Sequence, residues 1–124
     1  MNKQNKKNTK FDLEERTARF AETIIVLCKK VQNNPASVVI ISQLIRSATS
    51  IGANYCEANG ASSKKDFRNK IFICKKEAIE TKYWLRLLVK ANESSEPLVG
   101  ECKVLWQEAQ ELTLIFSKIA KSSE

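Results

Sequence analysis

The feature that most constrains the fold is the spacing of apolar side chains, which recur three and four positions apart along four long stretches. In the first of these stretches, Leu13, Thr17, Phe20, Ile24 and Leu27 follow this pattern. Residues spaced in this way form one stripe along an α-helix, and the stripe needs other helices to cover it. The mean spacing of 3.5 residues favours helices that pack nearly parallel, at about 20° to one another.

Residues that start and stop helices divide the chain into four. We expect Asn34 to cap the second helix, with Pro35 as its first residue, and Ser63 to cap the third. Gly60 follows the second helix, where a residue in the left-handed conformation often stands, and Pro97 marks the start of the fourth. The expected helices are residues 12–33, 35–59, 64–92 and 97–121.

The three expected connections are short, so successive helices should run antiparallel. No stretch shows the strict alternation of polar and apolar residues that is typical of strands. We therefore expect an all-α domain, an antiparallel up-down-up-down four-helix bundle of residues 11–121. Residues 1–10 hold four lysines and no acid, and we expect them to form a flexible basic tail.

The residue types that are missing or unpaired argue against several classes of function. The chain has no histidine and no glycine-rich phosphate loop, and its four cysteines lack the paired spacing of zinc ligands. We therefore expect no metal, no cofactor and no enzyme activity. Three of the four cysteines fall on apolar helix faces, and we interpret the cysteines as reduced structural thiols. No apolar run approaches the roughly 18 residues of a membrane span, and the N-terminus does not resemble a signal peptide. We expect a cytoplasmic protein with no membrane partner.

The second expected helix carries small polar residues in a sector about 110° away from its apolar stripe. Solvated faces usually carry Lys and Glu, whereas small hydroxyl and amide side chains let another helix approach closely. We expect this sector to be either a packed face or a contact between copies of the protein, and a solvated face is the alternative. Arg46 and Glu57 flank the sector and are too far apart to pair, so each needs a partner such as Glu80 or Arg68 on the third helix. The expected oligomer interface consists of Gln43, Arg46, Ser47, Ser50, Asn54, Glu57 and Glu80.

The positive charge is concentrated in the middle of the chain. The net charge is +7, and residues 36–92 alone hold ten basic and four acidic side chains. On the third expected helix, four cations lie within about 40° of one another, which suits a phosphate backbone. A lysine-rich solvated face is the alternative, and no motif for reading bases is recognisable. The expected nucleic-acid-binding residues are Arg68, Lys75, Lys82 and Arg86, extended by Lys64 and Lys65.

Two segments carry a family resemblance: QLIRSATSIGANYCEA, from Gln43, and SKKDFRNKIFICKKEAIETKYWLRLL, from Ser63. They resemble the bacterial four-helix-bundle family that includes the proteins encoded in intervening sequences of 23S ribosomal RNA genes. The chain is also similar, more distantly, to the accessory proteins of diversity-generating retroelements. The resemblance covers about residues 11–120. It implies a ring of five bundles that binds nucleic acid or a partner enzyme and has no assigned catalysis.

These observations together predict a non-catalytic, oligomeric helical scaffold, pentameric by resemblance, that binds RNA or DNA through its basic surface. The alternative is an accessory subunit whose basic face binds an acidic protein partner, such as a reverse transcriptase. The basic middle and the acidic residues 93–124 also permit contact between copies of the chain.

Overall fold

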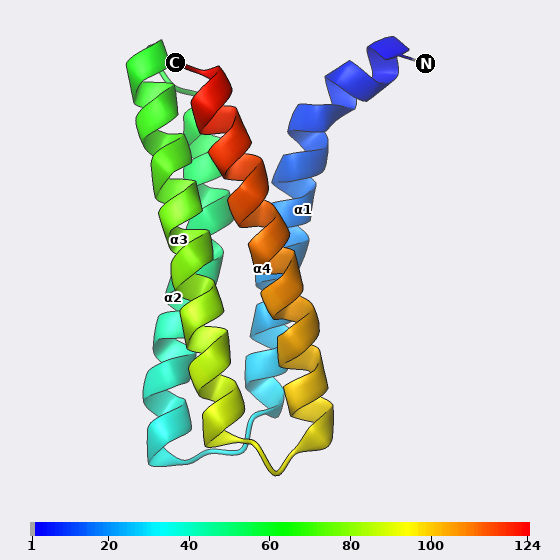
Figure 1. Cartoon of the computed structure of the whole chain (residues 1–124), viewed down its shortest axis with the longest axis vertical. Coiled ribbons are helices and arrows are strands. Elements are labelled where there is room, and N and C mark those ends of the chain that lie inside the picture. The colour runs from blue at the N-terminus through cyan, green and yellow to red at the C-terminus, as the bar shows by residue number, and fades with distance from the viewer. Residues whose placement is uncertain (1) are drawn as a thin grey trace.

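The fold is a four-helix arrangement in which the chain reverses direction at each connection (Figure 1). The computed structural model describes the backbone of residues 2–124 and the side chains of residues 13–124. Within this part of the chain there is no strand. The expected flexible tail of residues 1–10 falls on residues whose side chains lie outside this description. The helices are α1 (Asn2–Lys30), α2 (Pro35–Asn59), α3 (Lys64–Ala91) and α4 (Glu96–Ser122).

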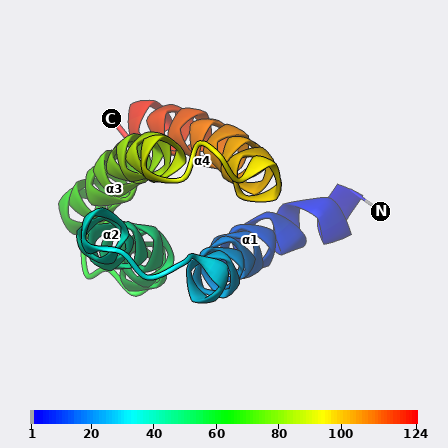
Figure 2. The same ribbon diagram turned by 90° about the horizontal axis from the view of Figure 1, so that it is seen from below.

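Each helix lies beside its neighbours in the chain. The contact between α2 and α3 is the most extensive, and that between α1 and α4 is the smallest. Viewed along the helices, α2, α3 and α4 follow one another closely, whereas α1 contacts mainly α2 (Figure 2). The bundle is therefore closed along three of its edges and held loosely along the fourth.

Helix capping explains where α2 and α3 begin. The side chain of Asn34 accepts a hydrogen bond from the Ser37 amide at 2.9 Å, and Pro35 occupies the first turn. The hydroxyl of Ser63 accepts one from the Asp66 amide at 3.0 Å. These two caps are as predicted. The prediction for Gly60 was wrong: its φ is −101°, so the end of α2 needs no left-handed residue.

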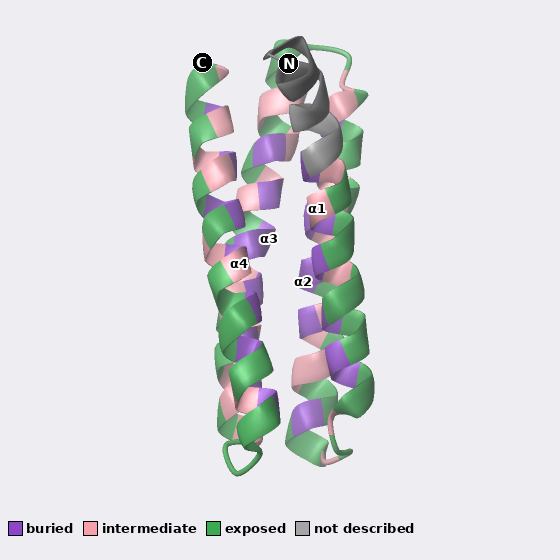
Figure 3. Cartoon of the chain, turned by 90° about the vertical axis from the view of Figure 1, so that its right-hand side faces the viewer, coloured by how far each residue is buried: buried purple, intermediate pink, exposed green. Residues whose placement is uncertain are grey.

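The core forms from the apolar stripes that the spacing predicts. Figure 3 shows the buried residues on the sides of the helices that face one another. The stripe of α1 is buried from Leu13 to Leu27. Phe116 of α4 packs against Tyr55 of α2, and the centroids of the two rings are 5.9 Å apart. Burying such side chains contributes about 1.5–3 kcal/mol each to folding. The fully buried large apolar residues are Ile24, Leu44, Ile51, Ile71, Leu85, Leu88, Leu112 and Phe116.

Helix α2 also has a length and composition that would suit a membrane span. The sequence analysis predicted no such stretch, because Ser42 and Gln43 interrupt the longest apolar run. In the structure α2 packs between α1 and α3, and core helices of soluble proteins pass the same hydropathy test. We interpret α2 as a core helix of the bundle.

Close packing of α1 against α2 generates the first testable prediction. A Cβ added to Gly52 would lie 3.0 Å from Oγ1 of Thr17, which is buried and fixed by hydrogen bonds to the carbonyls of Leu13 and Glu14. A Cβ added to Gly100, on α4, meets nothing within 4 Å. We expect Gly100→Ala to raise the free energy of unfolding by about 0.5–1 kcal/mol, because Ala favours helix. Gly52→Ala should instead lower it by about 1 kcal/mol through overpacking.

Urea denaturation of the two variants measures the difference directly. If both substitutions raise the free energy of unfolding equally, α1 and α2 can move apart at Gly52 without destabilising the protein.

Candidate nucleic-acid interface

The small polar sector of α2 faces α3 of the same chain. Ser47 is fully buried, and its hydroxyl accepts a hydrogen bond from Thr81 Oγ1 at 2.9 Å. Ser47 donates its own proton to the carbonyl of Leu44, and the single hydroxyl proton of Thr81 is shared between Ser47 and the carbonyl of Glu77, so the buried hydroxyls are satisfied. Small side chains at this contact let the two helix backbones approach closely.

Ion pairs close the solvent edge of the α2–α3 contact. Arg46 pairs with Glu80 and with Glu77, the latter at 3.3 Å. Glu77 is only 8% exposed, so its carboxylate needs a cation close by. Trp84 donates its indole N–H to Glu80 at 3.0 Å. The predicted pairing of Arg46 with Glu80 is therefore confirmed, and Glu77 is a partner that the sequence analysis missed.

Glu57, near the end of α2, pairs with Lys70 of α3 at 2.7 Å rather than with Arg68. The carboxylate of Glu57 accepts a hydrogen bond from Lys70 and raises the pKa of its ammonium group. Glu57 is exposed and Lys70 only half-buried, so the pair adds little stability. Its effect here is to leave Arg68 without a carboxylate partner among residues 13–124.

The structure places one residue of the expected oligomer interface, Ser47, inside the chain's own fold. Ser47 cannot contact another copy, because α3 of its own chain covers it completely. Asn54 turns its amide onto Ser50, donating to the Ser50 carbonyl and hydroxyl at 2.8 and 2.9 Å. Gln43 accepts a hydrogen bond from Arg46. Close packing within one chain thus accounts for Ser47. The other expected interface residues are half-buried or exposed and stay open to a second copy.

The outer side of α3 gathers the cations that the sequence analysis singled out. The spacing turns Arg68, Lys75 and Arg86 about 120° or more away from the acids that pair with Arg46, whereas Lys76 lies closer to Glu80 around the helix. Among residues 13–124, none of these cations has an ion-pair partner within 4 Å. We call this surface the basic face of α3. It consists of Lys64, Lys65, Arg68, Lys75 and Arg86, which the sequence analysis named, and of Lys76, which it did not.

Lys82 differs from the other predicted binding residues, because α4 of the same chain holds it. Its ammonium group donates to Oε1 of Gln110 at 2.6 Å and lies 5.3 Å from the ring centroid of Trp106. A cation over an indole ring stabilises the contact between the helices. Lys82 therefore belongs to the α3–α4 packing and lies beside the basic face.

Exposed apolar side chains run along the middle of the basic face. Phe72, Ile79 and Tyr83 are 50%, 46% and 54% exposed. The prediction of binding residues included the cations but not Tyr83. The signal was present, since Phe72, Lys76, Ile79 and Tyr83 are four, three and four positions apart and so form a second stripe on the outer side of α3.

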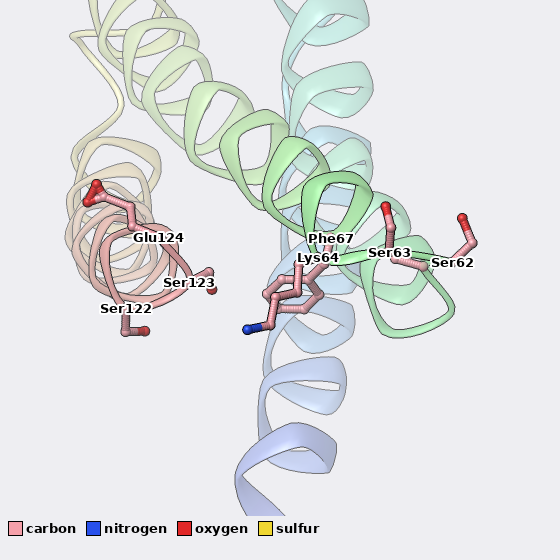
Figure 4. Close-up of a pocket in the computed structure, with 8 residues that line it drawn as sticks. Ser62, Ser63, Lys64, Phe67, Ser122, Ser123 and Glu124 are labelled. Carbon is pink, nitrogen blue, oxygen red and sulfur yellow. The ribbon is translucent and has the colours of Figure 1, made fainter.

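A shallow hollow of about 450 Å³ adjoins the basic face where α3 begins. Figure 4 shows the Lys64 and Phe67 side chains at the start of α3 turned toward the end of α4, whereas the Glu124 carboxylate points away from them. Hydroxyl groups from both helices line the rest of the hollow. The lining of the hollow thus combines one cation, Lys64, with neutral hydroxyl groups and one acid, Glu124.

The thiols show no arrangement for catalysis among the described residues. Cys28, Cys74 and Cys102 are buried, and burial raises the pKa of Cys28 and Cys102 to about 11 and that of Cys74 to about 12. A thiol with such a pKa is a poor nucleophile near neutral pH. Cys56 is exposed. Among residues 13–124, no group of three or more Cys, Asp or Glu side chains is placed to hold a metal ion.

The sequence of the chain matches the family model described as 23S rRNA-intervening sequence protein over residues 9–114. The chain belongs to this family. The match covers all of α2 and α3 and most of α1 and α4, so it includes both the α2–α3 contact and the basic face.

A solved structure supports the same assignment. It is a protein of unknown function from the S23 ribosomal protein family of Bacteroides thetaiotaomicron, and it shares 35% sequence identity with this chain. The similarity covers 87% of this chain and 97% of that one, with a TM-score of 0.77. The comparison with curated protein sequences gives no match. Neither the family nor the solved structure points to a catalytic family.

The Arg46 ion pairs provide a second prediction. Arg46→Met leaves Glu77 and Glu80 facing each other on α3 with no cation between them. We expect the free energy of unfolding to fall by about 1–2 kcal/mol, less than for a fully buried pair because Arg46 is partly exposed. The control is Lys90→Met, which removes an exposed partner of Glu93 and should change stability by less than about 0.5 kcal/mol. Thermal or urea unfolding measures both, and equal effects would show that the Arg46 pairs are ordinary surface contacts.

Proposed function

We propose that the protein is a non-catalytic, oligomeric scaffold of the cytoplasm that binds nucleic acid, RNA in the first place, through the basic face of α3. The observation that carries this proposal is the separation of charges on α3. Glu77 and Glu80 pair with Arg46 on the side toward α2, and the cations on the outer side have no carboxylate partner among residues 13–124. A row of unpaired cations suits a polyanion, because each neutralised phosphate releases counterions.

RNA is the first choice because the family is named for an intervening sequence of 23S rRNA. The contacts available on the basic face are to phosphates, which carry no sequence information. Binding should therefore be sensitive to salt and only weakly dependent on base sequence.

Charge reversal on the basic face tests this proposal. We expect Lys75→Glu with Arg86→Glu to weaken RNA binding by tenfold or more at fixed salt, and to reduce the slope of log affinity against log salt by about two phosphate contacts. The matched control is Lys29→Glu with Lys118→Glu, which changes the net charge equally on exposed sites of α1 and α4. Fluorescence anisotropy with a labelled RNA measures each affinity. If both double variants bind equally well, the basic face is not the binding surface.

We also propose that the scaffold is a homo-oligomer, a five-membered ring by resemblance to its family. The support on this chain is the number of large apolar side chains exposed to solvent, among them Val38 and Val39 on α2, at 52% and 63%. The half-buried Ser50 and Asn54 at the edge of the α2–α3 contact remain available to a neighbouring copy.

Substitution of Ser50 tests whether this edge joins the copies. We expect Ser50→Lys to convert the assembly to monomers that keep their helical circular dichroism, because a buried lysine at an interface is costly. Ser42→Lys is the control, since Ser42 is exposed on the same helix but away from α3. Light scattering gives the mass of each. If the wild-type protein is a monomer, the proposal of a ring is wrong. If Ser50→Lys leaves the mass of the assembly unchanged, the copies meet at a surface other than the Ser50 edge.

A second candidate function is an accessory subunit that binds an acidic protein, such as a reverse transcriptase. The exposed Phe72, Ile79 and Tyr83 favour it, because apolar side chains ringed by charge are common at protein interfaces. The two functions differ in one measurement: a chain that fails to bind RNA and DNA even at low salt would leave only the protein partner.

A further inference from the structure

We infer that the basic face of α3 binds single-stranded nucleic acid, with Phe72 and Tyr83 as stacking platforms for unpaired bases. The inference rests on the proposed function and narrows its ligand from any polyanion to an unpaired strand. It comes from the position of two half-exposed aromatic rings among unpaired cations, a combination that a purely electrostatic surface does not need.

The two rings lie on the same line along α3. They are eleven residues apart, which places them within about 20° of one another around the helix and about 16 Å apart along it. At the 3.4 Å spacing of stacked bases, this distance corresponds to about five nucleotides. Ile79 lies between the rings on the same line and is 46% exposed, so the apolar track is continuous.

Cations flank this track on both sides. Arg68, Lys75 and Arg86 lie about 40–60° to one side of Phe72, and Lys65 and Lys76 about 20–40° to the other. A strand whose bases lie on the rings would therefore bring its phosphates within reach of the cations. This pairing of aromatic platforms with a cationic groove is how proteins bind single strands without sequence preference.

The Tyr83 ring is held in position by a neighbouring aromatic ring. It makes an edge-to-face contact with Trp84, with ring centroids 5.1 Å apart and an interplanar angle of 70°. Trp84 is held in turn by its hydrogen bond to Glu80, which pairs with Arg46. The α2–α3 ion pairs thus orient one of the two platforms, and a braced ring loses less conformational freedom when a base stacks on it.

A duplex would use this face poorly. Its bases are stacked inside the helix, so a duplex could satisfy the cations but would leave Phe72 and Tyr83 against its sugar–phosphate backbone. A single strand satisfies both kinds of group. An acidic polypeptide could also satisfy the cations, but it has no flat aromatic surfaces to place on the rings.

The test compares an oligouridylate with a hairpin duplex of the same length, by fluorescence anisotropy at one salt concentration. We expect the wild-type chain to bind the single strand more tightly than the duplex. Phe72→Leu with Tyr83→Leu should weaken single-strand binding roughly tenfold for each ring lost and leave duplex binding unchanged. Leucine keeps the face apolar and favours helix, so the variant should fold, which circular dichroism checks.

Two controls separate stacking from other causes. Phe72→Tyr with Tyr83→Phe exchanges the rings and should bind as the wild type does, whereas Ile79→Leu alters apolar shape without a ring and should change nothing. Polyglutamate serves as a competitor and should displace the single strand much less effectively than unlabelled oligouridylate.

Three results would overturn the inference: equal affinity for duplex and single strand, full single-strand affinity in the double leucine variant, or equal displacement by polyglutamate. The last result would favour an acidic protein as the natural partner. Failure of the broader proposed function looks different, because the charge-reversal variant would then bind every nucleic acid as the wild type does.

Discussion

The contact between α2 and α3 is the constraint on which the rest of this structure depends. Its centre is the buried hydrogen bond between Ser47 and Thr81, and its solvent edge is the pairing of Arg46 with Glu77 and Glu80. In this contact Glu77 and Glu80, the two acids in the middle of α3, pair with Arg46. They therefore do not neutralise the cations on the outer side of the same helix, which stays positive. One interaction therefore sets both how closely the helices pack and where the free charge lies.

Much of the fold could be predicted from the sequence, because a stripe of apolar residues and a pair of caps depend on local spacing. The buried run from Leu13 to Leu27, the Asn34 cap and the Ser63 cap all follow from rules that act within a few residues. Gly60 was misread because glycine permits the left-handed conformation without requiring it. A glycine at the end of a helix therefore predicts a left-handed residue less reliably than an apolar stripe predicts a buried helix face.

The role of the small polar sector of α2 could not be predicted in the same way. Angular spacing shows that Ser47 and Asn54 form a second face, but it does not show which helix covers that face. Every helix in a four-helix arrangement touches two neighbours, so a second packed face needs no second copy of the chain. The structure shows α1 against Gly52 on one side of α2 and α3 against Ser47 on the other. Similarly, spacing placed Lys82 with the other cations, but only the position of Trp106 shows that α4 holds it.

The weak contact between α1 and α4 has a consequence for how this bundle comes apart. Ion pairs span that edge, with Arg16 joined to Glu108 and Glu111, and Lys30 to Glu101, and salt weakens such pairs more than it weakens an apolar core. Local opening follows the path of least buried surface, so α1 should swing away from α4 while α2, α3 and α4 stay together. Raising the ionic strength should therefore ease the separation of α1 from α4, whereas the buried apolar stripe of α1 resists its separation from α2.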